Sequence, residues 1–113
     1  MHIVNDAEAL ARLDGEREIY AELITAFLQD SQNDMDQLRD AVSVQNYEKT
    51  AYHAHKIKGA ALTLGAELLS LHAENLEQAS RKGEKKDFNA LFSDMQTAYT
   101  AAVERLVELF NDL

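Results

Sequence analysis

The sequence predicts an all-α fold, an antiparallel up-down four-helix bundle with a short N-terminal helix that caps one end. Three observations lead to this prediction. The chain of 113 residues contains no proline, so nothing forces a break inside a long helix. Four segments repeat apolar residues every three or four positions, the period of a helix buried on one face. Short polar turns join these segments, and short turns make successive helices antiparallel.

The short N-terminal helix is expected over about residues 6–13. Asn5 and Glu8 have the spacing of a capping box, in which each side chain satisfies an amide of the first turn. Gly15 is suited to end the helix. We expect Leu10 and Leu13 to face inward, with the helix lying across one end of the bundle as a lid.

The first bundle helix is expected over about residues 16–42. Its apolar stripe has a 4-3-4-3-4 spacing, with two aromatic residues on the same side: Ile24, Leu28, Ser31, Met35, Leu38 and Val42, with Tyr20 and Phe27. The polar residues of this segment are expected mostly on the other faces: Asp30, Gln32, Asp34 and Asp36.

The second bundle helix is expected over about residues 47–64, with Asn46 as its N-cap. Its inward stripe is rich in alanine, which lets neighbouring helices come close: Tyr47, Ala51, Ala54, Ile57 or Lys58, Ala61 and Leu64. A second face carries Tyr52, His55, Gly59 and Leu62. Apolar residues on both sides of a histidine and a glycine are unusual on a solvent face and typical of a docking surface. The alternative is that this strip is buried and His55 belongs to the core.

The last two helices are expected over about residues 66–82 and 88–111. Gly65 ends the preceding helix, and Gly83 follows two cations that favour a helix C-terminus. Asp87 is the expected N-cap of the final helix. The two inward stripes are Leu68, Leu69, His72, Leu76 and Ala79, then Phe88, Leu91, Phe92, Met95, Tyr99, Ala102, Val103, Leu106, Leu109 and Phe110.

The charge of the chain is unevenly distributed. The net charge is −9, made up of −8 over residues 1–48, +3 over residues 49–86 and −4 over residues 87–113. Such a chain should repel nucleic acid and anionic membranes. The positive segment contains His55, which fits a site for a small anion or an acidic partner, although basic residues on a solvated helix face would give the same pattern.

Several classes of protein are excluded by composition and motifs. The chain has no cysteine, so disulfides, thiolate metal sites and thiol nucleophiles are absent. No run of about 18 apolar residues could span a membrane, and the N-terminus lacks the pattern of a secretory signal. We therefore expect a cytoplasmic protein. No nucleotide-binding loop or serine hydrolase motif occurs, so the chain should not phosphorylate itself.

The histidine spacing also argues against a metal site. The Glu-x-x-His motif of di-iron bundles does not occur, because Thr50, Tyr52 and Leu69 stand three residues before the histidines of the helical segments. His53 and His55 point about 200° apart on a helix and cannot share an ion. We expect no metal and no cofactor on this chain.

One patch remains as a candidate site. His55, Lys58 and Gly59 share one helix face at positions i, i+3 and i+4. An imidazole is a nucleophile near neutral pH without special activation. If it takes up a phosphoryl group, Lys58 would offset the new charge, and Gly59 would keep the space over the ring open. Gly59 inside a helix costs about 1 kcal/mol relative to alanine, which suggests that access to the ring is its purpose.

The segment from Ala54 to Ala61 reads Ala-His-Lys-Ile-Lys-Gly-Ala-Ala, and Gly65-Ala66 follows it. This pattern resembles the signature of histidine-containing phosphotransfer domains of bacterial phosphorelays, and the likeness extends over nearly the whole chain. The resemblance implies that His55 is the phosphorylated histidine, with Lys58 and Gly59 as the nearby lysine and glycine. His53 does not match, because Ile57 stands four residues after it. Glu77 falls where some members carry a glutamine near the imidazole, which leaves open whether it contacts His55.

The resemblance further implies a monomeric phosphocarrier, not a nucleotide-dependent enzyme. Its partners would be receiver domains of response regulators or of a hybrid sensor kinase, and these would supply Mg²⁺ and most of the catalysis. Tyr52, Lys56 and Leu62 are the residues expected to contact such a partner. The alternative is a bundle that binds a partner through the Tyr52/Leu62 strip with no covalent step. A third possibility, a domain of the same fold that has lost phosphorylation, is opposed by the presence of His55.

Overall fold

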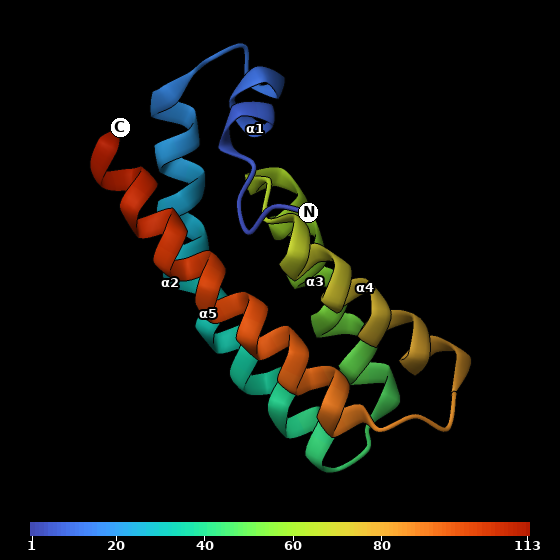
Figure 1. The fold of residues 1–113 in the computed structure, drawn as a ribbon. Coiled ribbons are helices and arrows are strands. Elements are labelled where there is room, and N and C mark those ends of the chain that lie inside the picture. Colours follow the sequence, from blue (N-terminus) through green and yellow to red (C-terminus); the bar gives the residue numbers. More distant parts are fainter.

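The fold is an antiparallel bundle of helices, as predicted. The computed structural model describes residues 1–113 and contains five helices and no strand (Figure 1). The elements are α1 (Asp6–Arg12), α2 (Arg17–Ser43), α3 (Tyr47–Leu64), α4 (Glu67–Lys82) and α5 (Phe88–Asp112). Helices α2 to α5 run up and down in turn, and α1 covers one end. The ends of α3 coincide with those predicted, and those of the other helices differ by at most one residue.

Helix ends form where the sequence supplies caps. The side chains of Asn46 and Asp87 accept hydrogen bonds from the third residue after each of them, at 3.1 and 3.0 Å. Gly65 and Gly83 adopt the left-handed conformation at the ends of α3 and α4. Such a conformation strains other residues, so these glycines mark the two turns from the sequence alone.

The capping box before α1 forms only in part. Asn5 Oδ1 accepts a hydrogen bond from the backbone of Glu8, as predicted. The carboxylate of Glu8, however, contacts the side-chain amide of Asn5 at 3.3 Å and not its backbone amide. That backbone amide donates to the carbonyl of Gly65 at 2.7 Å. The N-terminal segment is thereby tied to the turn between α3 and α4.

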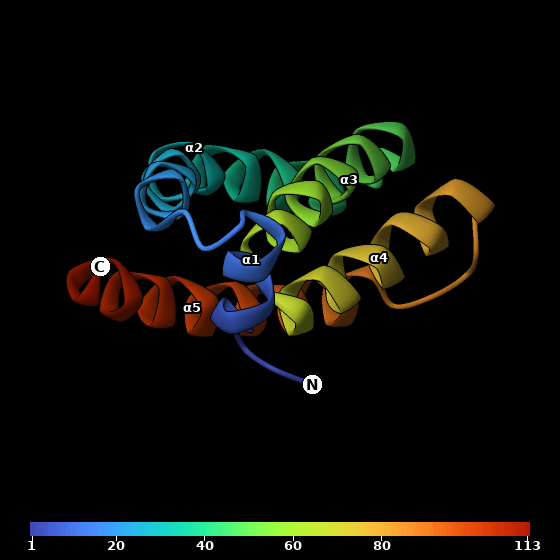
Figure 2. The same cartoon turned by 90° about the horizontal axis from the view of Figure 1, so that it is seen from above.

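The bundle is elongated and has two unequal pairs of helices. Its extents are 42 × 22 × 19 Å. Helices α2 and α5 are the longest, and α1 fills the space beyond the shorter α3 and α4 (Figures 1 and 2). Alanines with no exposed surface line α3 and α4, and they let these two helices pack closely: Ala54, Ala61 and Ala73. Large fully buried side chains fill the remaining core, namely Tyr20, Ile24, Met35, Leu38, Ile57, Leu64, Leu69, Leu76, Met95 and Leu106.

Gly65 is required at the α3–α4 turn for two reasons. Its φ is +81°, and a Cβ atom at this position would lie 2.5 Å from the backbone oxygen of Asn5. Arg12 of α1 also donates to the carbonyl of Leu62 at 2.8 Å, and the Tyr20 hydroxyl donates to that of Leu64 at 2.9 Å. The end of α3 is therefore fixed by contacts from three other segments.

The prediction for Asp34 was wrong. This residue is buried, although its position in the sequence placed it off the inward stripe of α2. Its Oδ1 lies 3.3 Å from His53 Nδ1 and 3.3 Å from Lys56 Nζ, both on α3. A buried carboxylate is tolerated when it is paired, and the periodicity of α2 alone could not reveal partners on another helix.

Two predicted core residues are also partly exposed. Phe110, near the end of α5, is 43% exposed, whereas its neighbour Leu109 is buried. Tyr47 begins α3 at the opposite end and is 38% exposed, with its ring stacked on Phe88 at 4.9 Å. Of the two residues proposed for the inward position in mid-α3, Ile57 is buried and Lys58 lies at the edge. The other residues of the predicted stripes are buried or partly buried.

Candidate functional site

His55 lies on the exposed face of α3, with its side chain 61% exposed. Tyr52, Gly59 and Leu62 are exposed on the same face. The alternative in which this strip is buried and His55 is a core residue is therefore wrong. A ring in this position can be reached by another molecule, while α3 holds its backbone in regular hydrogen bonds on both sides.

The imidazole is oriented by Glu77 of α4. His55 Nδ1 lies 2.9 Å from Glu77 Oε2. Glu77 is almost fully buried, with its side chain only 4% exposed. Two cations approach the same carboxylate, since Lys58 Nζ lies 2.8 Å from Oε1 and Arg81 Nε donates to Oε2 at 2.9 Å. The question that the sequence left open has an answer here, because Glu77 does contact His55.

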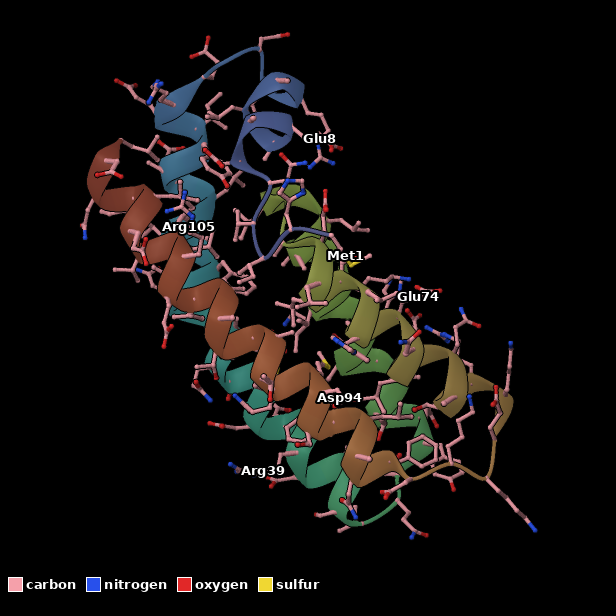
Figure 3. All side chains as sticks on the ribbon, viewed as in Figure 1. Met1, Glu8, Arg39, Glu74, Asp94 and Arg105 are labelled. Carbon is pink, nitrogen blue, oxygen red and sulfur yellow. The ribbon has the colours of Figure 1, made fainter.

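The cations keep Glu77 ionised. Burial acts to raise the pKa of this carboxyl group, but hydrogen bonds from Lys58 and Arg81 outweigh burial and hold the pKa below its ordinary value. Hydrogen bonds to Glu74 and then to Glu77 raise the pKa of the Lys58 ammonium. Lys58 in turn lowers the pKa of Glu74, which lies 2.8 Å away on α4 and is labelled in Figure 3. Glu77, Glu74, Lys58 and Arg81 therefore form a cluster of groups that are charged near neutral pH.

An ionised carboxylate determines which imidazole nitrogen is free. Glu77 can only accept a hydrogen bond, so His55 Nδ1 must carry the proton and donate it. In the neutral ring the lone pair is then on Nε2, the nitrogen that Glu77 does not contact. The arrangement presents one defined nucleophilic atom, and the carboxylate stabilises any positive charge that develops on the ring.

Gly59 is not required by the fold. It lies inside α3 with ordinary helical geometry, and a Cβ atom built there meets nothing within 4 Å. Alanine would fit this position and would favour the helix by about 1 kcal/mol. Packing within the chain therefore does not explain the glycine, and the access role suggested by the sequence stays a prediction.

The basic residues of the predicted site are engaged in ion pairs. Lys58 is only 19% exposed and is paired with two carboxylates, so its charge is neutralised within the protein. Lys56 pairs with Asp34 of α2 at 3.3 Å, and its side chain is 57% exposed. Tyr52 is exposed and its ring meets the edge of His53 at 5.0 Å.

Two residues of the charged cluster around Glu77 were not predicted. Glu74 and Arg81 lie three residues before and four residues after Glu77, so both share its helix face. This spacing could have predicted them once Glu77 was singled out. The contacts of Asp34 with His53 and Lys56 lie outside this cluster, and they could not be predicted in the same way because they join α2 to α3.

Two further features of the structure concern a metal site and a helix that could span a membrane. No group of three histidine, aspartate or glutamate side chains lies close enough together to hold a metal ion. None of the helices combines the length and the apolar character needed to cross a membrane.

Comparison with known proteins places the chain in a family. No curated protein matches the sequence. Among solved structures, the chain is similar to the histidine-containing phosphotransfer protein B (HptB) of Pseudomonas aeruginosa PAO1, with a TM-score of 0.88 and 22% sequence identity. That alignment covers 98% of this chain and 96% of the other, and it shows that the two share a fold. The model of the Hpt domain matches residues 22–108. The chain therefore belongs to the Hpt domain family, whose members carry out histidine phosphotransfer in phosphorelays.

Proposed function

We propose that His55 is the residue that carries the phosphoryl group, through its Nε2 atom. The observation that supports this best is the hydrogen bond between Nδ1 and the buried, ionised Glu77. It leaves Nε2 as the free nucleophile on an exposed ring. The other histidines of the bundle are less suitable, since His53 is buried against Asp34 and His72 is partly buried.

The transfer proceeds by a simple exchange of bonds. The lone pair of Nε2 attacks the phosphorus of an aspartyl phosphate on a receiver domain. A P–N bond forms while the P–O bond to the aspartate breaks, and the carboxylate leaves with the electron pair. The ring keeps its proton on Nδ1 and becomes cationic, and Glu77 stabilises it. The reverse exchange passes the group to a second receiver.

In this proposal most of the catalysis comes from the partner. The chain offers a positioned nucleophile, and the receiver supplies Mg²⁺ and most of the stabilisation of the transition-state charge. The exposed residues Tyr52 and Leu62 flank His55 and would contact the receiver, and Gly59 would admit it. Membership of the Hpt family does not favour the alternative of a purely non-covalent interaction domain.

The test is to label the purified protein with a small phosphoryl donor, phosphoramidate, and with a phosphorylated receiver. The wild-type protein should acquire one acid-labile phosphate, and His55→Gln should acquire none. His72→Gln should label normally and serves as the matched control. His53→Gln should also label. Its folding is checked by circular dichroism first, because the substitution changes a buried contact with Asp34. Two-dimensional ¹H–¹⁵N spectra of the labelled ring distinguish Nε2 from Nδ1. Normal labelling of His55→Gln would show the assignment to be wrong.

A further inference from the structure

We propose that Arg81 is a catalytic residue of the transfer, and that its terminal guanidinium nitrogens donate hydrogen bonds to the phosphoryl group on His55. This inference rests on the proposed function of His55. It replaces Lys58, which the sequence suggested as the source of positive charge, with a residue that the sequence did not single out.

Lys58 is poorly suited to the role. Its ammonium group lies 2.8 Å from Glu74 and 2.8 Å from Glu77, and the side chain is largely covered. Two carboxylates already neutralise its single charge. If Lys58 turned toward a phosphoryl group, its contacts to these carboxylates would weaken, and Glu77 would rely more on Arg81. Lys58 therefore acts on the site by holding Glu77 in place.

Arg81 has donors to spare. Only its Nε is engaged, at 2.9 Å from Glu77 Oε2, and the side chain is 53% exposed. A guanidinium group carries five N–H donors in a planar fork that matches the oxygens of a phosphoryl group. The four N–H groups on the two terminal nitrogens have no partner within the protein. Arg81 can therefore keep its bond to Glu77 and still offer donors to a second anion.

The position of Arg81 brings these donors close to His55. Arg81 Nε and His55 Nδ1 contact the same oxygen, Glu77 Oε2, each at 2.9 Å. The two nitrogen atoms are therefore at most twice that distance apart. Nε2 is on the same five-membered ring as Nδ1, and in the proposed contact the guanidinium group turns about its bond to Glu77 toward the phosphoryl group on Nε2. One oxygen of Glu77, Oε2, thus positions both His55 and Arg81.

Open space beside Arg81 completes the arrangement. A shallow hollow of about 300 Å³ is lined by Glu48, Lys49, Tyr52 and Arg81. Lys49 forms no ion pair within the protein, so the hollow contains two cations with unused donors against one carboxylate. Tyr52 also belongs to the exposed strip that contains His55. The guanidinium group borders this hollow and is not enclosed on that side.

The experiment compares three variants after labelling by phosphoramidate, with no partner protein present. Arg81→Ala removes the cation, and Arg81→Lys keeps the charge without the fork. Lys82→Ala removes a neighbouring exposed cation of the same sign and serves as the matched control. The ionisation of the phosphoryl group on His55 is followed by ³¹P NMR as a function of pH, and the initial rate of labelling is measured in parallel.

If Arg81 contacts the phosphoryl group, its loss should disfavour the doubly charged form of that group. The midpoint of the ³¹P titration should rise by about 0.7 pH unit in Arg81→Ala, which is a fivefold change and the size of an exposed ion pair. Labelling should slow by a similar factor. Arg81→Lys should restore part of both effects, and Lys82→Ala should behave like the wild type.

Three results would overturn the proposal, and one of them also distinguishes it from the proposed function. A wild-type ³¹P titration in Arg81→Ala would exclude the contact, even if the imidazole resonances of the unlabelled protein shift, because Arg81 would then act on Glu77 alone. An equal shift in Lys82→Ala would indicate an effect of overall charge. Failure of the wild-type protein to take up phosphate on His55 would refute the carrier function itself.

Discussion

Replacing Glu77 tests how the free nitrogen of His55 is selected. Two substitutions separate the hydrogen bond from the charge. Glu77→Gln keeps an oxygen that can accept from Nδ1, whereas Glu77→Ala removes the acceptor. In the alanine variant the ring is free to place its proton on Nε2, and that tautomer has no lone pair on Nε2 with which to attack phosphorus.

The contacts of Glu77 set the expected magnitudes. In wild type the carboxylate accepts a charge-assisted hydrogen bond from the ring at 2.9 Å. Such a bond contributes about 1.5–3 kcal/mol, and its loss in Glu77→Ala should slow transfer by about 10- to 100-fold. The amide of Glu77→Gln retains a neutral hydrogen bond and loses about 1 kcal/mol, so transfer should slow only about fivefold.

The same substitutions should change stability. Glutamine can direct its oxygen toward His55 and Arg81, but its amide nitrogen then faces the Lys58 ammonium, and two donors meet. Because Lys58 retains Glu74, we expect a loss of about 1–2 kcal/mol in the free energy of unfolding. The pKa of Glu77 is lowered in the folded protein, so its contribution is present above the ordinary carboxyl pKa and is lost as the pH falls through the folded value.

The assay is the initial rate of labelling by a fixed receiver, with urea unfolding measured on each variant at neutral and acidic pH. The difference in stability between wild type and Glu77→Gln should shrink below about pH 4.5, where unfolded carboxyl groups become protonated. Wild-type transfer by a folded Glu77→Ala protein would contradict the selection of Nε2 by Glu77. A stability difference that persists undiminished at low pH would contradict the ionised state of this carboxyl group.

Three further outcomes are expected. Gly59→Ala should raise the free energy of unfolding in urea by up to about 1 kcal/mol. Gly59→Leu should fold, accept phosphate slowly from a receiver and accept it at the normal rate from phosphoramidate. Equal rates from both donors in the leucine variant would argue against a role in access. Lys58→Ala should slow phosphoryl transfer from a receiver without preventing it, because Arg81 still contacts Glu77. Either no transfer or an unchanged transfer rate would contradict this prediction. Hydrogen bonds from the backbone of His2, then from the side chains of Asn5 and His2, lower the pKa of Glu67 to about 2. The N-terminal segment should therefore stay attached at pH 4.5 and loosen as the pH falls toward 2. The measurement is the protection of amides near His2 from hydrogen exchange, relative to an unfolded chain at the same pH. Loss of this protection at pH 4.5 would contradict the prediction.

The helices could be predicted because their causes are local. Asn46 and Asp87 cap the helices that follow them, Gly65 and Gly83 end the helices that precede them, and the absence of proline leaves the intervening periodicity unbroken. Each of these signals acts within one turn of the chain. Burial was also predictable in the middle of the bundle, where every inward position has neighbours on other helices.

The rest depends on contacts between helices or on the unequal lengths of the helices. Phe110 has the right spacing for the core but is exposed near the end of α5. Asp34 breaks the apolar pattern of α2 and is nevertheless buried, because α3 supplies His53 and Lys56. For the site, the motif around His55 indicated the exposed ring. The ion pair between Lys58 and Glu74 could not be predicted, because it depends on how α3 packs against α4.

In the proposed function, the single free nitrogen of His55 also limits how the protein can serve its partners. Donor and acceptor must both reach that atom from the open side of α3, because the opposite face of the helix is packed against the bundle. Two partners cannot occupy this opening together. A relay through it must therefore run in alternating visits, and an excess of one unphosphorylated partner should inhibit exchange with the other by simple competition.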